Sequence, residues 1–158
     1  MNVTRQIFLI LFLVFSVFQI AQASELDHCL ARVHQVKGTH IVLREEQVRA
    51  CFKNNKKNIN ANLCFQAVAR DPLVAKSINF KEELNSFCFY QVAQFNNPQE
   101  CMAKIPIFSS ADNRDEAVFS CYQRFQNKIG RQLCLRMSEQ MVFDEKKDHL
   151  QNRCFDLR

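Results

Sequence analysis

The sequence contains no tryptophan, two glycines and three prolines among its 158 residues. An all-β fold needs many tight turns that usually carry glycine or proline, so this composition favours helices. The sequence also has no Cys-x-x-Cys pair, no cysteine and histidine spacing typical of zinc sites, and no Gly-x-Ser-x-Gly motif. These absences argue against a zinc centre and a serine hydrolase. We therefore expect an all-α protein with no catalytic residue, no cofactor and no metal.

A long apolar run occurs only near the N-terminus, at residues 7–18. It follows Arg5 and precedes an Ala-Gln-Ala sequence at residues 21–23, which is the pattern of a cleavable signal peptide over residues 1–23. A retained membrane anchor is the alternative, but the run is shorter than the roughly 18 to 20 apolar residues that a spanning helix needs. The sequence thus predicts a secreted or periplasmic protein that is not stably inserted in a membrane after signal cleavage.

Neither charge dominates: 21 basic and 16 acidic residues give a formal net charge of +5. This excess is too small to indicate a nucleic-acid partner.

Eight cysteines follow the predicted signal peptide, an even number in a chain expected to be exported. Disulfides persist in exported proteins, so this count predicts a disulfide framework. The predicted disulfide cysteines are Cys29, Cys51, Cys64, Cys88, Cys101, Cys121, Cys134 and Cys154.

A nine-residue phrase occurs four times and ends at every second cysteine. It reads as a basic residue, an acid, a second acid or histidine, four variable residues, a cysteine and an aromatic residue. The copies are "REEQVRACF" (44–52), "KEELNSFCF" (81–89), "RDEAVFSCY" (114–122) and "KDHLQNRCF" (147–155). Their spacing of 33 to 37 residues is the length of one helix–turn–helix unit.

Turn signals such as "KGTH" (37–40) and "NNP" (96–98) fall within and between these units. We expect four tandem disulfide-linked αα-hairpins, which form a short α-solenoid or helical bundle. They would make up a single helical repeat domain over residues 24–158, with units of about 24–58, 59–97, 98–130 and 131–158. Pairing within each unit uses every cysteine, whereas pairing between units leaves Cys29 and Cys154 over. The predicted pairs are Cys29–Cys51, Cys64–Cys88, Cys101–Cys121 and Cys134–Cys154.

The repeated acids fall near the expected starts of the second helices. We expect Asn79 and Asp112 to be N-caps there, and the acids to be stabilised by the helix dipole. Replacing Glu82 and Glu83 by glutamine should then cost about 1 kcal/mol or less, and removing Cys64 and Cys88 several times as much. Catalytic carboxylate pairs at Glu45/Glu46, Glu82/Glu83 and Asp115/Glu116 are the alternative, although adjacent helical residues do not face each other.

The aromatic residues are expected to form the core, and the histidines to lie on the surface without a recurring partner. The core candidates are Phe52, Phe89, Tyr122 and Phe155 from the phrase, with Phe65, Phe87, Phe95, Phe119, Phe125 and Phe143; the histidines are His28, His34, His40 and His149.

We expect the protein to act as an interaction module that binds another protein. The alternative is a small secreted inhibitor or effector that acts on an enzyme or a membrane. A concave groove lined by polar and aromatic residues would favour a protein ligand, and a contiguous exposed apolar patch would favour action on a membrane.

Overall fold

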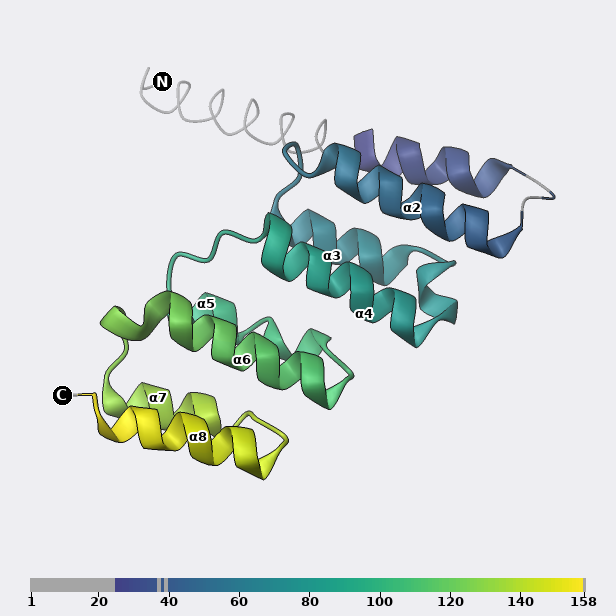
Figure 1. Ribbon diagram of the computed structural model, residues 1–158. Coiled ribbons are helices and arrows are strands. Elements are labelled where there is room, and N and C mark those ends of the chain that lie inside the picture. The colour runs from purple at the N-terminus through teal and green to yellow at the C-terminus, as the bar shows by residue number, and fades with distance from the viewer. Residues whose placement is uncertain (1–24, 37, 39, 158) are drawn as a thin grey trace, which may run out of the picture. The chain divides into compact units, whose positions relative to one another are not determined.

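The computed structural model describes residues 25–157 except 37 and 39 (Figure 1). The predicted signal peptide and the predicted mature terminus at Ser24 lie outside the described residues. The described residues form helices and no strand. This confirms the all-α prediction. The chain divides into two compact bodies, Met1–Ser77 and Ile78–Arg158, each of which is described by itself. A single domain over residues 24–158 stays a prediction.

The N-terminal body begins with a helix of residues 25–35, followed by α2 (Ile41–Asn55), α3 (Ala61–Arg70) and the short 3₁₀ helix η1 (Val74–Lys76). The turn before α2 contains Gly38 with a φ of 81°, a conformation that side chains with a Cβ atom rarely adopt. A disulfide between Cys29 and Cys51 joins the two helices on either side of this turn, with a Cα–Cα distance of 5.7 Å.

Apolar side chains from all of these elements are buried in the N-terminal body. Phe52, the aromatic residue that ends the first copy of the repeated phrase, is completely buried, as predicted. Asp71, which follows α3, is also buried, and its carboxylate accepts hydrogen bonds from the backbone N–H groups of Leu73 (2.8 Å) and Val74 (3.1 Å). Its second oxygen lies 2.9 Å from His34 Nε2. The buried apolar side chains of these elements are Leu26, Leu30, Val33, Val48, Cys51, Phe52, Cys64, Ala67, Val68 and Val74.

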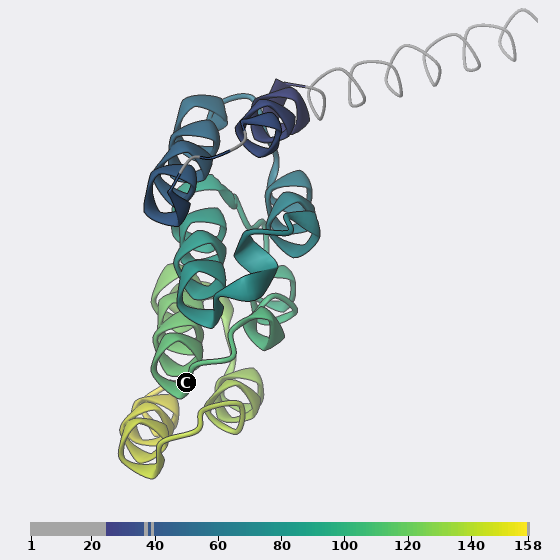
Figure 2. The same ribbon diagram turned by 90° about the vertical axis from the view of Figure 1, so that its right-hand side faces the viewer.

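The C-terminal body contains five α-helices and three short helices of other types. They are α4 (Ile78–Phe87), the π-helix η2 (Cys88–Val92), α5 (Pro98–Met102), η3 (Ile105–Ile107), α6 (Ala111–Phe125), η4 (Gln126–Lys128), α7 (Arg131–Ser138) and α8 (Asp144–Phe155). Within this body α4, α6 and α8 lie side by side in one layer, and α5 and α7 form a second layer (Figures 1 and 2).

Disulfides join the two layers of the C-terminal body. Cys101 of α5 is bonded to Cys121 of α6, and Cys134 of α7 is bonded to Cys154 of α8. Each of these bridges lies inside one helical hairpin rather than between neighbouring hairpins. Cys64 and Cys88 are also both disulfide-bonded, and all of the cysteines are in disulfides. Such complete oxidation is typical of proteins from an oxidising compartment.

Helix starts differ from the expected positions by about two residues. α6 is capped by Ser110, whose hydroxyl accepts from Asn113 N, so Asp112 lies inside the first turn. α4 begins at Ile78, so Asn79 lies inside that helix as well. Both N-cap predictions were therefore wrong, because several polar residues near each start could serve as the cap. α5, by contrast, begins at Pro98, at the predicted "NNP" break.

Most of the predicted aromatic core is buried or half-buried, with two exceptions. Phe143 and Phe155 are 42% and 55% exposed, so their assignment to the core was wrong. Phe155 lies instead beneath Arg131, whose guanidinium carbon is 4.4 Å from the ring centroid. Phe108, which was not among the candidates, is completely buried and packs edge-on against Phe89 with ring centroids 5.5 Å apart.

Candidate functional site

The first acid of the phrase connects neighbouring hairpins in the C-terminal body. Glu82 of α4 is only 6% exposed. Its carboxylate accepts hydrogen bonds from the backbone N–H of Ser109 and from the side-chain amide of Asn113, the latter at 2.8 Å. Asn85, one turn further along α4, donates to the carbonyl of Ile107 at 3.2 Å. Glu82 therefore holds α4 against the loop that precedes α6.

Asp115 repeats this arrangement 33 residues later. It lies on α6, is completely buried, and accepts from the backbone N–H groups of Val142 (2.7 Å) and Phe143 (3.0 Å). These two donors belong to the loop between α7 and α8. Because the carboxylate is completely buried, its oxygens need hydrogen-bond donors, and the two N–H groups supply them. Both of its oxygens are thus occupied in holding the fold together.

The repeated acids are not equivalent. Glu45, at the same phrase position in the N-terminal body, lies 3.7 Å from Arg49 one turn along α2, and Asp148 at this position in α8 is exposed. The prediction that these acids act through the helix dipole was wrong for Glu82 and Asp115, because their partners lie on the next hairpin rather than on their own helix. The structure also separates two of the three pairs, since Glu83 and Glu116 are exposed while Glu82 and Asp115 are buried.

Replacing Glu82 by glutamine is therefore expected to destabilise the protein by about 1–3 kcal/mol, because the charge-assisted bonds to Ser109 and Asn113 weaken. The matched change Glu83→Gln on the exposed side of α4 should cost about 0.5 kcal/mol or less. Guanidinium unfolding followed by circular dichroism measures both values. Equal costs at the two positions would contradict the connecting role of Glu82.

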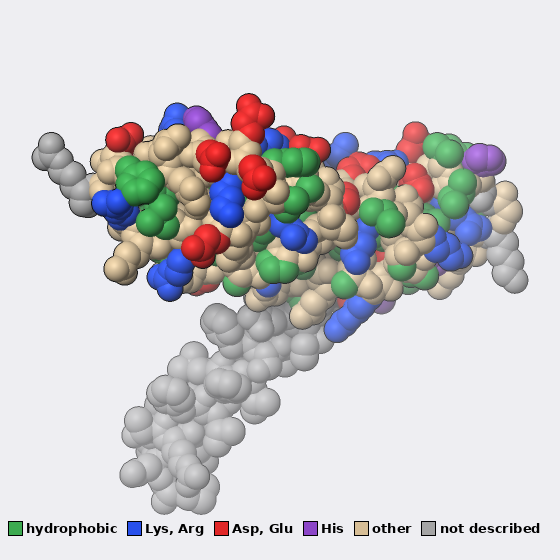
Figure 3. Space-filling model, turned by 90° about the horizontal axis from the view of Figure 1, so that it is seen from below, with side chains coloured by type: hydrophobic (Ala, Val, Ile, Leu, Met, Phe, Trp, Pro, Cys, Tyr) green, Lys and Arg blue, Asp and Glu red, His purple; other side chains and the backbone are tan. Residues whose placement is uncertain are grey.

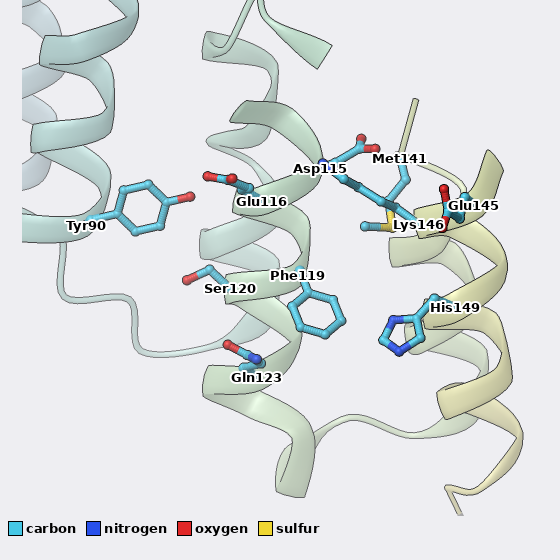
Figure 4. Close-up of a pocket in the computed structure, with 10 residues that line it drawn as sticks. All are labelled: Tyr90, Asp115, Glu116, Phe119, Ser120, Gln123, Met141, Glu145, Lys146 and His149. Atoms are coloured by element: carbon cyan, nitrogen blue, oxygen red, sulfur yellow. The ribbon is translucent and has the colours of Figure 1, made fainter. Parts of the chain in front are cut away.

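The helices of the C-terminal body form a groove that is lined by chemically varied side chains. It has a volume of about 740 Å³ and is formed by α6 and α8, with one residue from η2 and one from the loop between α7 and α8 (Figure 4). We call it the α6/α8 groove. It is lined by Tyr90, Asp115, Glu116, Phe119, Ser120, Gln123, Met141, Glu145, Lys146 and His149.

Helical spacing places these residues together. Glu116, Phe119, Ser120 and Gln123 recur at intervals of three or four residues and so share one face of α6. From α8, His149 reaches the same groove, and its ring centroid lies 5.8 Å from that of Phe119. Glu116 and His149 occupy the same position of the repeated phrase, so this column of the repeat forms part of the groove.

Charges in the groove are only partly paired. Lys146 lies 3.1 Å from Asp112 and 5.3 Å from the Phe143 ring centroid. The hydroxyl of Tyr90 points towards Glu116 (Figure 4). Partial burial, and secondly the negative charge of Glu116, raise the pKa of Tyr90 to about 12. Tyr90 therefore stays a neutral phenol at physiological pH and can donate a hydrogen bond.

Two histidines have partners that the sequence did not indicate. His34 bonds to the buried Asp71, and His149 stacks near Phe119. Among the described residues no group of three or more histidine, cysteine or acidic side chains could hold a metal ion. In the same part of the chain, no helix is both long enough and apolar enough to span a membrane.

No protein-family model matches this chain, and no curated protein or solved structure is significantly similar to it.

Proposed function

We propose that the protein is a secreted or periplasmic interaction module that binds a segment of another protein in the α6/α8 groove. The observation that carries this proposal is the groove itself. Its volume of about 740 Å³ lies in the range of ligand sites, and its lining combines aromatic rings with polar and charged groups. Such a lining suits a peptide, which brings apolar side chains together with backbone donors and acceptors.

Disulfides and hydrogen bonds connect the elements that form the groove. α6 and α8 are each held by a disulfide to the second layer, and Asp115 fixes the loop between α7 and α8. A preformed site avoids the entropy cost of ordering its walls when the ligand binds. Asp115 therefore supports binding indirectly, by holding one edge of the groove in place.

The surface charge favours a protein partner over nucleic acid. The net charge is only +5, and on the face shown in Figure 3 acidic and basic side chains are interspersed. A nucleic-acid surface would instead gather lysine and arginine into one patch.

Selection from a display library of random 12-residue peptides on the exported, oxidised protein tests the proposal. We expect enriched peptides that bind the wild type and lose binding to Ser120→Trp, because the indole would fill the groove. Gln132→Trp is the matched control, since Gln132 is exposed on α7 and does not line the groove. Failure to enrich any peptide, or equal binding to Ser120→Trp, would contradict the proposal.

Action on a membrane is the second candidate function, and an apolar patch in the N-terminal body favours it. Ile41, Val42 and Leu43 at the start of α2 are 52%, 52% and 53% exposed. Val36, whose carbonyl accepts a hydrogen bond from Arg44 of the same helix, is 47% exposed. Sedimentation with phospholipid vesicles distinguishes this function from peptide binding. Vesicle binding that is lost when these three residues of α2 become serine would favour the membrane over the groove.

A further inference from the structure

We infer that the α6/α8 groove selects an arginine side chain of the bound segment, with the guanidinium group placed against the ring of Tyr90 and paired with Glu116. This inference rests on the proposed function, because it names the chemistry of the ligand that the groove takes.

The charge of the groove supports a cationic ligand. Asp115 uses both oxygens to bind the backbone of Val142 and Phe143, and Lys146 is paired with Asp112. The exposed carboxylates of Glu116 and Glu145 remain, and among the described residues neither has an ion-pair partner. The chain as a whole is basic, with a net charge of +5, so this local negative charge is opposite in sign to that of the protein.

Aromatic rings favour arginine over lysine. A guanidinium group is planar and weakly hydrated, so it stacks on aromatic faces more readily than an ammonium group does. The C-terminal body already uses this contact. Arg153 lies 5.8 Å from the ring centroid of Phe119, and Arg124 lies 5.6 Å from that of Phe95. The ring of Tyr90 lies beside the carboxylate of Glu116 (Figure 4), which is the same combination with the cation left to the ligand.

The polar end of the groove matches the donors of a guanidinium group. Glu116 and the hydroxyl of Tyr90 point towards each other (Figure 4). The carboxylate accepts hydrogen bonds, and the oxygen of the neutral phenol has a lone pair that can also accept. Arginine has five N–H donors in a fixed planar arrangement, so it can bind a carboxylate through two of them.

Titration of the isotope-labelled, oxidised protein with acetylated hexapeptides, followed by NMR, tests this inference. The peptides share a glycine–serine sequence and differ at one position, which is arginine, citrulline, lysine, glutamate or leucine. We expect amide shifts in α6 and α8 with the arginine peptide and about tenfold weaker binding of the citrulline peptide, which has the same shape without the charge.

A matched pair of variants separates the groove from general charge effects. Glu116→Gln is expected to weaken arginine-peptide binding about five- to tenfold, as for loss of one partly exposed ion pair with its hydrogen bonds. Glu139→Gln changes the net charge equally but lies at the end of α7, outside the groove. Its effect should be less than about twofold, because screening weakens distant charges.

Each outcome decides the inference. Equal binding of the arginine, citrulline and leucine peptides would overturn it and leave peptide binding in the groove intact. The same conclusion follows if none of the five peptides binds while the display library still yields groove-binding peptides. Absence of binding in both experiments would overturn the proposed function as well.

Discussion

Replacing Asp115 by alanine is expected to destabilise the protein by about 3 kcal/mol, whereas Asp148→Ala should cost less than about 0.5 kcal/mol. The two residues occupy the same position of the repeated phrase. Asp115 is completely buried and bonds to the N–H groups of Val142 and Phe143. Alanine would leave both of these donors without their partner, whereas Asp148 is exposed on α8.

Chemical denaturation of the oxidised variants, followed by far-ultraviolet circular dichroism, measures this difference. Asp115→Asn adds a graded test, because the amide oxygen can accept one hydrogen bond and lacks the charge. The free energy of unfolding of Asp115→Asn should therefore lie between those of Asp115→Ala and the wild type. If Asp115→Ala and Asp148→Ala cost the same, the acids would act within their own helices, as the sequence first indicated.

Removing the disulfide between Cys134 and Cys154 is the second change with a large expected effect. The bridge closes a sequence separation of 20 residues, for which the chain-entropy model gives about 3 kcal/mol. α7 has 8 residues and α8 has 12, and helices this short are marginal without packing. We expect the last hairpin of the double Cys→Ala variant to open. The groove would then lose the side chains that α8 contributes.

Hydrogen exchange measured by mass spectrometry detects this opening. Amides of α7 and α8 should lose protection in the variant, and binding of groove peptides should disappear with them. The control removes Cys29 and Cys51, whose bridge lies in the N-terminal body, and should leave the protection of α8 unchanged. Full protection of α8 without its bridge would show that packing alone holds the hairpin.

The helical hairpins were predictable because their signals are local and periodic. Cysteine spacing, turn residues and the repeat of 33 to 37 residues all describe segments no longer than about one unit. The partners of Glu82 and Asp115 were not predictable in this way, because they lie 27 to 31 residues further along the chain. A local pattern indicates that an acid lies near a helix start. It does not indicate that the backbone of the next hairpin donates a hydrogen bond to that acid.

The repeat also did not predict which aromatic residues are exposed. Phe155 stands where Phe52, Phe89 and Tyr122 are buried, yet it is 55% exposed. The repeat predicts the same buried position for Phe155, but this residue lies on the last hairpin of the described chain and contacts Arg131 instead.

The groove, in contrast, had a usable signal in the sequence. Glu116 and His149 share one column of the repeated phrase, and both line the groove. From the sequence we interpreted this column as part of a helix start, with paired catalytic carboxylates as the alternative. An alignment of the four phrases shows that this column changes from glutamate to histidine. Such a change in charge indicates a position that could belong to a binding surface.

Mapping a selected peptide on the protein by hydrogen exchange tests the central claim most directly. Binding in the α6/α8 groove predicts that the peptide protects amides of residues 116–123 and 145–149 and leaves residues 41–43 unchanged. Protection at the apolar start of α2, with no change in α6 and α8, would contradict the account.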